Sequence, residues 1–418
     1  MRHALIAALM GAVLWTAAPV AQEAAGLDLE ISFWEKRVAR DRDDHISPTR
    51  LGAAYLAKAR QTGDFRLYHK AEGAFEEAVQ RAPTHYSALS QLAAARAARH
   101  RFRDAIELAS KAVALEPAEP YAYTVLGDAH LAVGDLTQAE ATYAKLAELA
   151  PGHLIDTRLA NLRHDRGDTR GALTLLERAL ADAVARQAPA SVTSWCHVRM
   201  GSMAFDGGDW NTAERHYTAA LEISPDSFAA LEHLAELRSA QGRTAAALTL
   251  YERTLAIAPL PEFMEAVAGI HQKTGNHAEA ARWHTRALAG YREAVDAGDI
   301  GYYRPLALFH ADVRQAQAEA VEWARKDLAV RQDVLTWGTL AWVLYRAGDY
   351  QEARDAARKA TAGGTADAKI WFTSGMVALK LKDHTKADAD LRHALELNPK
   401  FDRAAEARGA LRALGIRR

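Results

Sequence analysis

The sequence predicts an all-α solenoid of about ten helix-turn-helix units with capping helices at both ends. Two observations carry this prediction. Prolines recur every 34 residues, at Pro83, Pro117 and Pro151 and again at Pro225 and Pro259. Between them lie pairs of stretches with apolar residues at helical spacing. A fixed period of this length is typical of a stack of like supersecondary units rather than of unrelated domains.

The first segment of the chain has the features of a secretory signal peptide. Arg2 and His3 precede an apolar run over residues 4–18, and small residues lead on to Ala21. We therefore expect residues 1–21 to be a signal peptide that is removed after export. An uncleaved inner-membrane anchor is the alternative, because the segment reaches the lower length limit for crossing a bilayer.

The repeats are expected to fill residues 51–400 and to be covered at both ends. Residues 22–50 are expected to form an N-terminal capping helix and a linker, with the helix running from Asp28 to Arg42. Residues 401–418 are rich in charge and alanine and are expected to form a C-terminal capping helix. Such caps hide the last apolar face of a repeat stack from water.

A Gly-Asp dipeptide marks the turn inside several units, as at Gly134-Asp135. Glycine can take the left-handed conformation that ends the first helix, and the Asp side chain can cap the amides that open the second. The proline at the end of the unit stops the second helix. The dipeptide recurs, once with Asn, at Gly167-Asp168, Gly208-Asp209, Gly275-Asn276 and Gly348-Asp349.

Four units depart from the period. The first has a stretched first helix that ends at Gly63-Asp64, and the fourth continues to Pro189. The seventh lacks its closing proline and runs to Gly298-Asp299. The eighth has Gln315 where the turn glycine should be. Longer helices in these units are expected to bend or widen the stack locally.

This pattern resembles the tetratricopeptide repeat, with an aromatic and Leu-Gly on the first helix and Ala, an aromatic and Pro on the second. Matching sets are Tyr123, Leu126, Gly127, Ala139, Tyr143 and Pro151; Met200, Gly201, Trp210, Ala213, Tyr217, Ala220 and Pro225; Trp337, Leu340, Ala341, Gly348, Tyr350 and Ala353; and Trp371, Gly375, Ala387, Leu391, Ala394 and Pro399. The resemblance implies a right-handed superhelix whose first helices line an open concave groove for an extended peptide or a partner helix. The lysine and asparagine set with which family members clamp a chaperone tail is not found.

The composition argues against a nucleic acid partner and excludes a disulfide within the chain. The 418 residues carry 52 basic and 53 acidic side chains, so no basic excess exists to neutralise a nucleic acid backbone. Cys196 is the one cysteine and cannot close a disulfide within the chain. We therefore expect a fold held by packing and no nucleic acid partner.

Catalytic signatures are missing from the sequence. It has no Gly-Lys dipeptide, no two glycines two positions apart and no His followed by Glu. A P-loop, a dinucleotide fingerprint, a nucleophile elbow and an H-E-x-x-H zinc motif are therefore excluded. We expect no enzyme activity, no cofactor, no metal and no small-molecule substrate. The scattered histidines are read as packing residues, and Cys196 as a small core residue.

Groove positions carried over from the family give two candidate partner-binding sets. Near the C-terminus they form an aromatic strip with basic edges, comprising Trp342, Tyr345, Arg346, Phe372, Met376, Leu379 and Lys380. An exposed strip of this kind marks an interaction site. The alternative is that it packs against a neighbouring helix or the terminal cap. The middle of the groove offers Arg158 and Arg199, followed by Glu232, Glu236, Glu262 and Glu265.

Three functions fit these observations. The first is a non-enzymatic periplasmic or secreted scaffold that binds a protein or peptide partner in the groove and organises an envelope complex. The second is a periplasmic escort that holds exported chains. The third is a regulator of a neighbouring enzyme or exporter, anchored in the inner membrane by an uncleaved first segment. Membrane contact is expected only in the third case.

Overall fold

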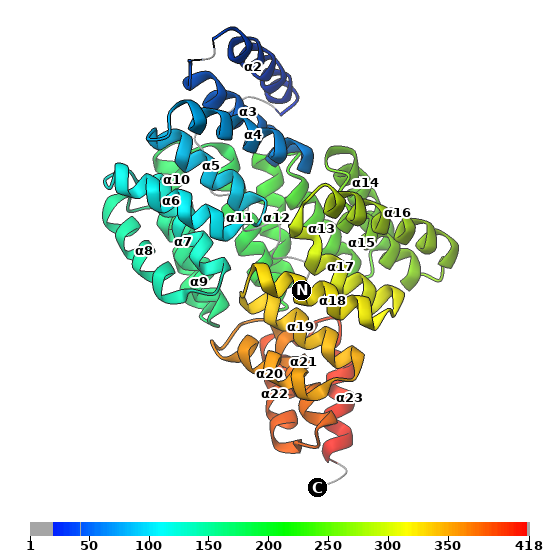
Figure 1. Ribbon diagram of the computed structural model, residues 1–418. Coiled ribbons are helices and arrows are strands. Elements are labelled where there is room, and N and C mark those ends of the chain that lie inside the picture. Colours follow the sequence, from blue (N-terminus) through cyan, green and yellow to red (C-terminus); the bar gives the residue numbers. More distant parts are fainter. Residues whose placement is uncertain (1–19, 42, 416–418) are drawn as a thin grey trace.

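The computed structural model describes residues 20–41 and 43–415, with side chains from residue 26 onward. This part of the chain forms 22 α-helices, α2 to α23, and no strand (Figure 1). The all-α solenoid expected from the sequence is therefore confirmed. The expected signal peptide, residues 1–21, lies outside the described residues except for its last two positions, which begin α2. Its cleavage stays a prediction.

Ten consecutive helix pairs form the repeat units. In order they are α3 (Ile46–Thr62) and α4 (Phe65–Arg81), α5 (Tyr86–Ala98) and α6 (Phe102–Leu115), α7 (Pro120–Ala132) and α8 (Leu136–Leu149), α9 (His153–Asp165) and α10 (Thr169–Ala185), α11 (Ala190–Asp206) and α12 (Trp210–Ile223), α13 (Phe228–Ala240) and α14 (Thr244–Ile257), α15 (Pro261–Lys273) and α16 (His277–Asp296), α17 (Tyr303–Phe309) and α18 (Gln317–Val330), α19 (Val334–Ala347) and α20 (Tyr350–Thr361), and α21 (Ala368–Lys380) and α22 (His384–Leu397). We number them units 1 to 10. The irregular eighth unit also holds the short turns η1 (Ile300–Tyr302) and η2 (His310–Arg314).

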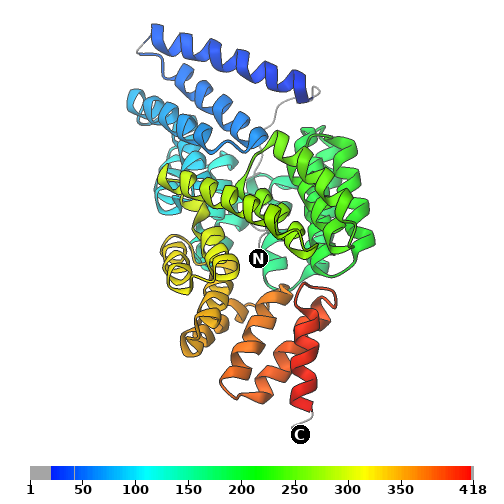
Figure 2. The same cartoon turned by 90° about the vertical axis from the view of Figure 1, so that its right-hand side faces the viewer.

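A helix covers each end of the stack. α2 (Val20–Arg40) packs on α3 and places Ile31 and Trp34 against the first core cluster. It starts earlier and ends sooner than the Asp28–Arg42 segment expected from the sequence. α23 (Ala404–Gly415) packs on unit 10 at the other end (Figures 1 and 2).

Glycines inside the first helices let the two helices of a unit approach closely. A Cβ added at Gly127 or Gly201 would overlap the ring of Tyr143 or Tyr217. Both rings are about 1% exposed and come from the second helix of the same unit. The glycine and the aromatic of the repeat are therefore two halves of one contact, which explains why they occur together.

The turns inside the units have the predicted geometry. Gly167 lies in the left-handed region, with φ of +82°, and Asp168 accepts a hydrogen bond from the amide of Gly171 at 2.8 Å. Gln315 takes the same left-handed conformation, with φ of +54°, at the place where the eighth unit lacks its glycine. The long second helices expected in units 4 and 7 are present, with 17 and 20 residues.

Successive turns of the superhelix touch one another, which the sequence did not predict. The internal turns of units 1 to 4 meet the starts of units 7 to 10. The amide of Gln332 donates to the carbonyl of Ala132 at 2.9 Å, and Arg99 Nη2 donates to the carbonyl of Gly298 at 3.3 Å. At the C-terminal end Lys400 Nζ donates to the carbonyl of Gly208 at 3.0 Å. We call this line of contacts the interturn seam.

The seam adds contacts that the packing of neighbouring units alone does not imply. Each unit is rotated relative to the one before it, and after six units the rotation brings the chain back onto itself. Segments about 200 residues apart in sequence then lie side by side, as the hydrogen bond between residues 132 and 332 shows. Pockets form along the seam that no single unit contains.

Candidate functional site

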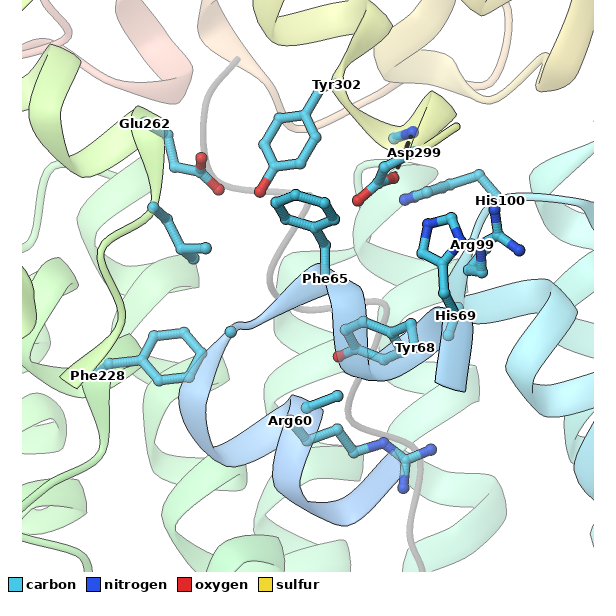
Figure 3. Close-up of a pocket in the computed structure, with 15 residues that line it drawn as sticks. Arg60, Phe65, Tyr68, His69, Arg99, His100, Phe228, Glu262, Asp299 and Tyr302 are labelled. Atoms are coloured by element: carbon cyan, nitrogen blue, oxygen red, sulfur yellow. Dashed lines mark hydrogen bonds between the residues drawn. The ribbon is translucent and has the colours of Figure 1, made fainter. Parts of the chain in front are cut away.

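One pocket lies where the turn of unit 1 and the end of α5 meet the starts of units 7 and 8. Its cavity volume is about 90 Å³, and it is open to solvent on one side. Its apolar wall consists of Phe65, Tyr68, Phe228, Leu260 and Tyr302, and its polar residues are Arg60, His69, Arg99, His100, Glu262 and Asp299. We call it the interturn pocket (Figure 3).

Local structure explains how these side chains come together. Phe65, Tyr68 and His69 lie on the first turns of α4, directly after the turn at Gly63-Asp64. Glu262 stands in the first turn of α15, after Pro261 has opened that helix. Tyr302 ends η1, whose first amides are capped by Asp299. The site is thus assembled from helix starts, which the seam brings together.

The acidic half of the pocket is short of partners. Figure 3 shows the Glu262 carboxyl and the Tyr302 hydroxyl pointing into the same space beside the ring of Phe65. Glu262 Oε2 is buried and has no hydrogen-bond partner. Burial, together with the carboxylates of Asp299 and Glu265, raises the pKa of Glu262 to about 7. Burial also raises the pKa of Asp299, although the amide of Gly301 and the guanidinium of Arg99 oppose this shift.

In the basic half of the pocket, Arg99 and His100 have partners within the chain, whereas Nε2 of His69 has none among the described residues. Arg99 forms an ion pair with Glu72, a carboxylate that is 3% exposed. His100 is buried and its Nδ1 lies 3.1 Å from Nη1 of Arg331. Burial lowers the pKa of His100 well below its ordinary value, and Arg331 and Arg304 lower it further. His100 is therefore neutral and accepts this hydrogen bond.

A second hollow, with a cavity volume of about 140 Å³, adjoins the first and shares Arg60, Ala98 and His100 with it. Its polar walls are ion pairs. Arg304 and Arg331 both bond to Asp327, from Nε at 3.2 Å and 2.6 Å. Small side chains from units 2 and 3, among them Ala97 and Thr124, leave the space open.

Arg158, predicted as a groove residue, lines this second hollow but is fully engaged. Its Nε and Nη2 bond to Asp128 at 3.0 and 2.9 Å, and Nη1 donates to the carbonyl of Leu154 at 2.7 Å. Arg199 donates from Nε and Nη2 to Asn161 Oδ1 at 3.1 and 3.0 Å. Both therefore brace adjacent first helices.

The aromatic strip near the C-terminus packs against the terminal capping helix, which was the alternative to an exposed interaction site. Trp342, Phe372 and Met376 are 4%, 1% and 8% exposed, because α23 lies over them and places Ala404 and Ala407 in the same core cluster. The indole Nε1 of Trp342 also donates to the carboxylate of Asp312 at 3.1 Å. The expectation of an exposed aromatic strip is therefore wrong for these three side chains. A capping helix supplies the apolar surface that a partner was expected to supply.

The remaining strip residues lie at the edge of this cluster. Tyr345 and Leu379 are partly buried against it, and Tyr345 stacks on Trp342 with ring centroids 5.6 Å apart. Arg346 forms an ion pair with Asp312. Lys380 is exposed, and its Nζ lies 5.9 Å from the centroid of the Tyr350 ring. The strip thus forms a structural layer under α23 with a charged rim.

One group of side chains has donor atoms that converge enough for a cation. Glu232, His233 and Glu236 on α13 place one ligand atom each within 4.8 Å of one another. His233 Nδ1 lies 3.2 Å from Glu232 Oε2, and its ring stacks on Tyr217 with centroids 5.5 Å apart. The sequence predicted no metal site, so this convergence was not expected.

Cys196 is buried, as expected for a core residue. Burial raises the pKa of its thiol to about 12. The thiol is therefore protonated and unreactive at neutral pH.

Sequence reasoning missed most residues of the interturn pocket. Glu262 was noted as a groove charge, but Phe65, Tyr68, Asp299 and Tyr302 were not proposed for any site. No signal in a 34-residue period relates unit 1 to unit 7, because the period describes neighbouring units only. In the described ranges, 20–41 and 43–415, no helix combines the length and apolar character needed to cross a membrane.

The chain matches known proteins in both sequence and fold. A stretch of 99 residues is 37% identical to the Hsp70-Hsp90 organizing protein of Triticum aestivum and covers 23% of this chain and 17% of that protein. The chain therefore spans about a sixth of the length of the curated relative that it matches. Among solved structures it is similar to a human IFIT1 dimer with m7Gppp-AAAA, at 14% identity and a TM-score of 0.49, over 95% of this chain and 91% of that one. It is also similar to yeast Tom70, at 12% identity and a TM-score of 0.40, over 94% and 93% of the two chains.

Family models identify the repeats directly. Four models, each described as tetratricopeptide repeat, match residues 96–165, 192–259, 264–299 and 368–401. These matches fall on units 2 to 4, 5 and 6, 7, and 10, where the structure has its helix pairs. The chain belongs to the tetratricopeptide repeat family.

Proposed function

We propose that this protein is a non-enzymatic periplasmic scaffold that holds a partner polypeptide at the interturn seam and organises an envelope complex. Tetratricopeptide proteins bind protein partners and generally act as scaffolds without catalysis. The proposal adds a place on the molecule and a cellular compartment to that general role.

The observation that carries the proposal is the interturn pocket. Most buried polar groups in proteins have a hydrogen-bond partner, and each exception needs an explanation. Here Glu262 Oε2 and His69 Nε2 are buried without a partner and belong to residues that line the same pocket. Aromatic rings lie between them, so the pocket offers both apolar contact and unused hydrogen bonds. This combination is typical of a binding site.

The periplasmic assignment rests on the first segment alone. Residues 1–21 combine a short basic start, an apolar run and small residues before polarity returns. Fractionation of cells that produce the tagged chain, with N-terminal sequencing, tests it. A mature chain in the periplasmic fraction that starts near Gln22 supports the scaffold. The full-length chain in the membrane fraction supports the anchored regulator instead.

A photo-crosslinking amino acid tests the partner-binding face. Ala97 lines the second hollow beside the interturn pocket, whereas Val184 is 62% exposed on α10 and serves as the control position. Irradiation in the native envelope is expected to give one abundant adduct from position 97 and none of that mass from position 184. The same adduct from both positions would contradict the proposal.

The number of adducts separates the scaffold from the escort. A scaffold gives one stoichiometric partner that survives salt. An escort gives many weakly bound clients, and the purified protein then suppresses the aggregation of unfolded chains.

A further inference from the structure

We propose that the interturn pocket binds an alkylammonium or guanidinium group, supplied by a lysine or arginine side chain of the bound partner. This inference rests on the proposed function, because the cation comes from the polypeptide held at the seam.

Within the part of the chain that the structure describes, Glu262 lacks a counter-charge. Among the described residues Glu262 forms no ion pair, and its Oε2 has no hydrogen-bond partner. Asp299 and Glu265 are the charged groups whose fields act on it, and both are acids. A carboxyl group that is removed from water and surrounded by other acids costs free energy unless a donor reaches it. A cationic donor satisfies the free oxygen and offsets the clustered negative charge.

The position of Glu262 at the start of α15 explains only part of why a carboxyl group is buried here. Glu262 stands in the first turn of α15, where the partial positive charge of the helix end favours a carboxylate. That interaction is made through the backbone and leaves Oε2 without a partner. Burial outweighs it, because the pKa of Glu262 is still raised to about 7.

The aromatic wall favours an organic cation over a metal ion. In Figure 3 the rings of Tyr302 and Phe65 lie on one side of the Glu262 carboxyl, and the ring of Phe228 lies below it at the lower left. Ring faces attract ammonium and guanidinium groups when water is excluded. Metal ions instead require several oxygen or nitrogen ligands at short range. The apolar lining also suits the methylene stem of a basic side chain.

The native cations of the pocket do not compete for Glu262. Arg99 pairs with Glu72, and Arg331 pairs with Asp327 and His100. In Figure 3 the guanidinium of Arg60 lies at the far end of the pocket from Glu262. The acidic half of the pocket is therefore available to a cation from outside the chain.

Matched small probes test the pocket directly on the full chain. n-Butylammonium and n-butylguanidinium mimic the two side-chain ends, and 1-butanol is the neutral control. Saturation-transfer NMR is expected to detect both cations and not the alcohol. Glu262→Gln keeps the shape and removes the charge, so cation binding should weaken about tenfold or more. Glu252→Gln changes an exposed carboxylate on α14 and should leave binding unchanged.

A second variant keeps the proposal testable if Glu262→Gln does not fold. Phe65→Leu keeps an apolar wall and removes a ring, and should weaken cation binding about threefold. Butanol binding as well as butylammonium, or cation binding that is unaffected by Glu262→Gln in a folded protein, overturns the proposal.

The partner experiment separates this inference from the proposed function. If Glu262→Gln abolishes both probe binding and the adduct from position 97, the cation belongs to the partner. If the probes lose binding and the adduct persists undiminished, the assignment to a partner side chain is wrong. If the wild-type chain gives no adduct at all, the proposed function fails, and the probe result still decides whether the pocket takes organic cations.

Discussion

Buried charges join unit 8 to the start of unit 9, and one of them, Arg331, also reaches across the interturn seam to His100. Arg304 and Arg331 are 2% and 4% exposed, and Asp327, at 1%, lies between them. A buried ion pair is costly to form but is more costly to break, because the partner that remains keeps its charge without water. This cluster therefore fixes the packing of unit 8 on unit 9 and the position of Arg331 at the seam, and single substitutions in it should be severe.

Asp327→Ala is expected to destabilise the protein by about 3 to 5 kcal/mol, since it leaves two buried guanidinium groups without their shared carboxylate. Glu279→Ala breaks an exposed ion pair with Arg282 and should cost less than about 1 kcal/mol. Denaturant unfolding followed by circular dichroism measures both. Equal losses for the two variants would show that the cluster is not buried as described.

Glu262→Gln should raise the melting temperature near pH 8 and leave it almost unchanged near pH 4. The pKa of Glu262 rises from 4.5 to about 7 in the folded chain. Below 4.5 the group is protonated in both states. Between 4.5 and 7 the unfolded chain releases its proton first, so stability falls as the pH rises, by at most about 3 kcal/mol above pH 7. If the difference in melting temperature between the variant and the wild type is the same at every pH in this range, the carboxyl is not buried.

Within the helices, the sequence predicted most of what the structure contains. The paired helices and the Gly-Asp turns follow from local rules that residues 34 apart obey together. The long helices of units 4 and 7 follow from the missing proline at the expected position of each unit. The covered strip at Trp342 was harder to judge, because an apolar groove face looks the same in sequence whether a partner or the protein's own α23 covers it. Only the position of α23 decides between the two.

Trp342→Ala is accordingly expected to destabilise the C-terminal units by about 3 to 5 kcal/mol, because a buried ring and its hydrogen bond to Asp312 are lost. Phe33→Ala removes a ring that is 52% exposed on α2 and should cost less than about 1 kcal/mol. Thermal unfolding compares them. A folded and equally stable Trp342 variant would mean that α23 does not pack there.

The molecule as a whole depends on the seam, and this is what the sequence could not show. A small rotation between neighbouring units accumulates over six units, and the period carries no information about its size. The residues of the interturn pocket therefore looked unrelated, although each stands at a position that the repeat explains locally. Glu262 and Tyr302 become a site only when unit 1 lies against units 7 and 8.

Alanine substitutions at two glycines with nearly equal backbone conformations test the contacts at the seam, with the melting temperature as the readout. Gly167 and Gly242 have φ of +82° and +75°, so alanine is strained at both and should cost about 1 kcal/mol. A Cβ at Gly242 meets open space, whereas one at Gly167 overlaps the carbonyl oxygen of Gly364 across the seam. Gly167→Ala should therefore lower the melting temperature at least about twice as much as Gly242→Ala. Equal shifts would argue that the two turns do not touch.

An engineered disulfide reports on the closed superhelix most directly. The backbones of Ala132 and Gln332 share a hydrogen bond of 2.9 Å, which brings the two residues within reach of a disulfide. The one native thiol, Cys196, is buried and does not compete. The Ala132→Cys, Gln332→Cys double variant is expected to crosslink on mild oxidation of the folded full chain, with each single variant as a control. Two free thiols that persist in the folded double variant would contradict the closed superhelix and, with it, the pocket at the seam.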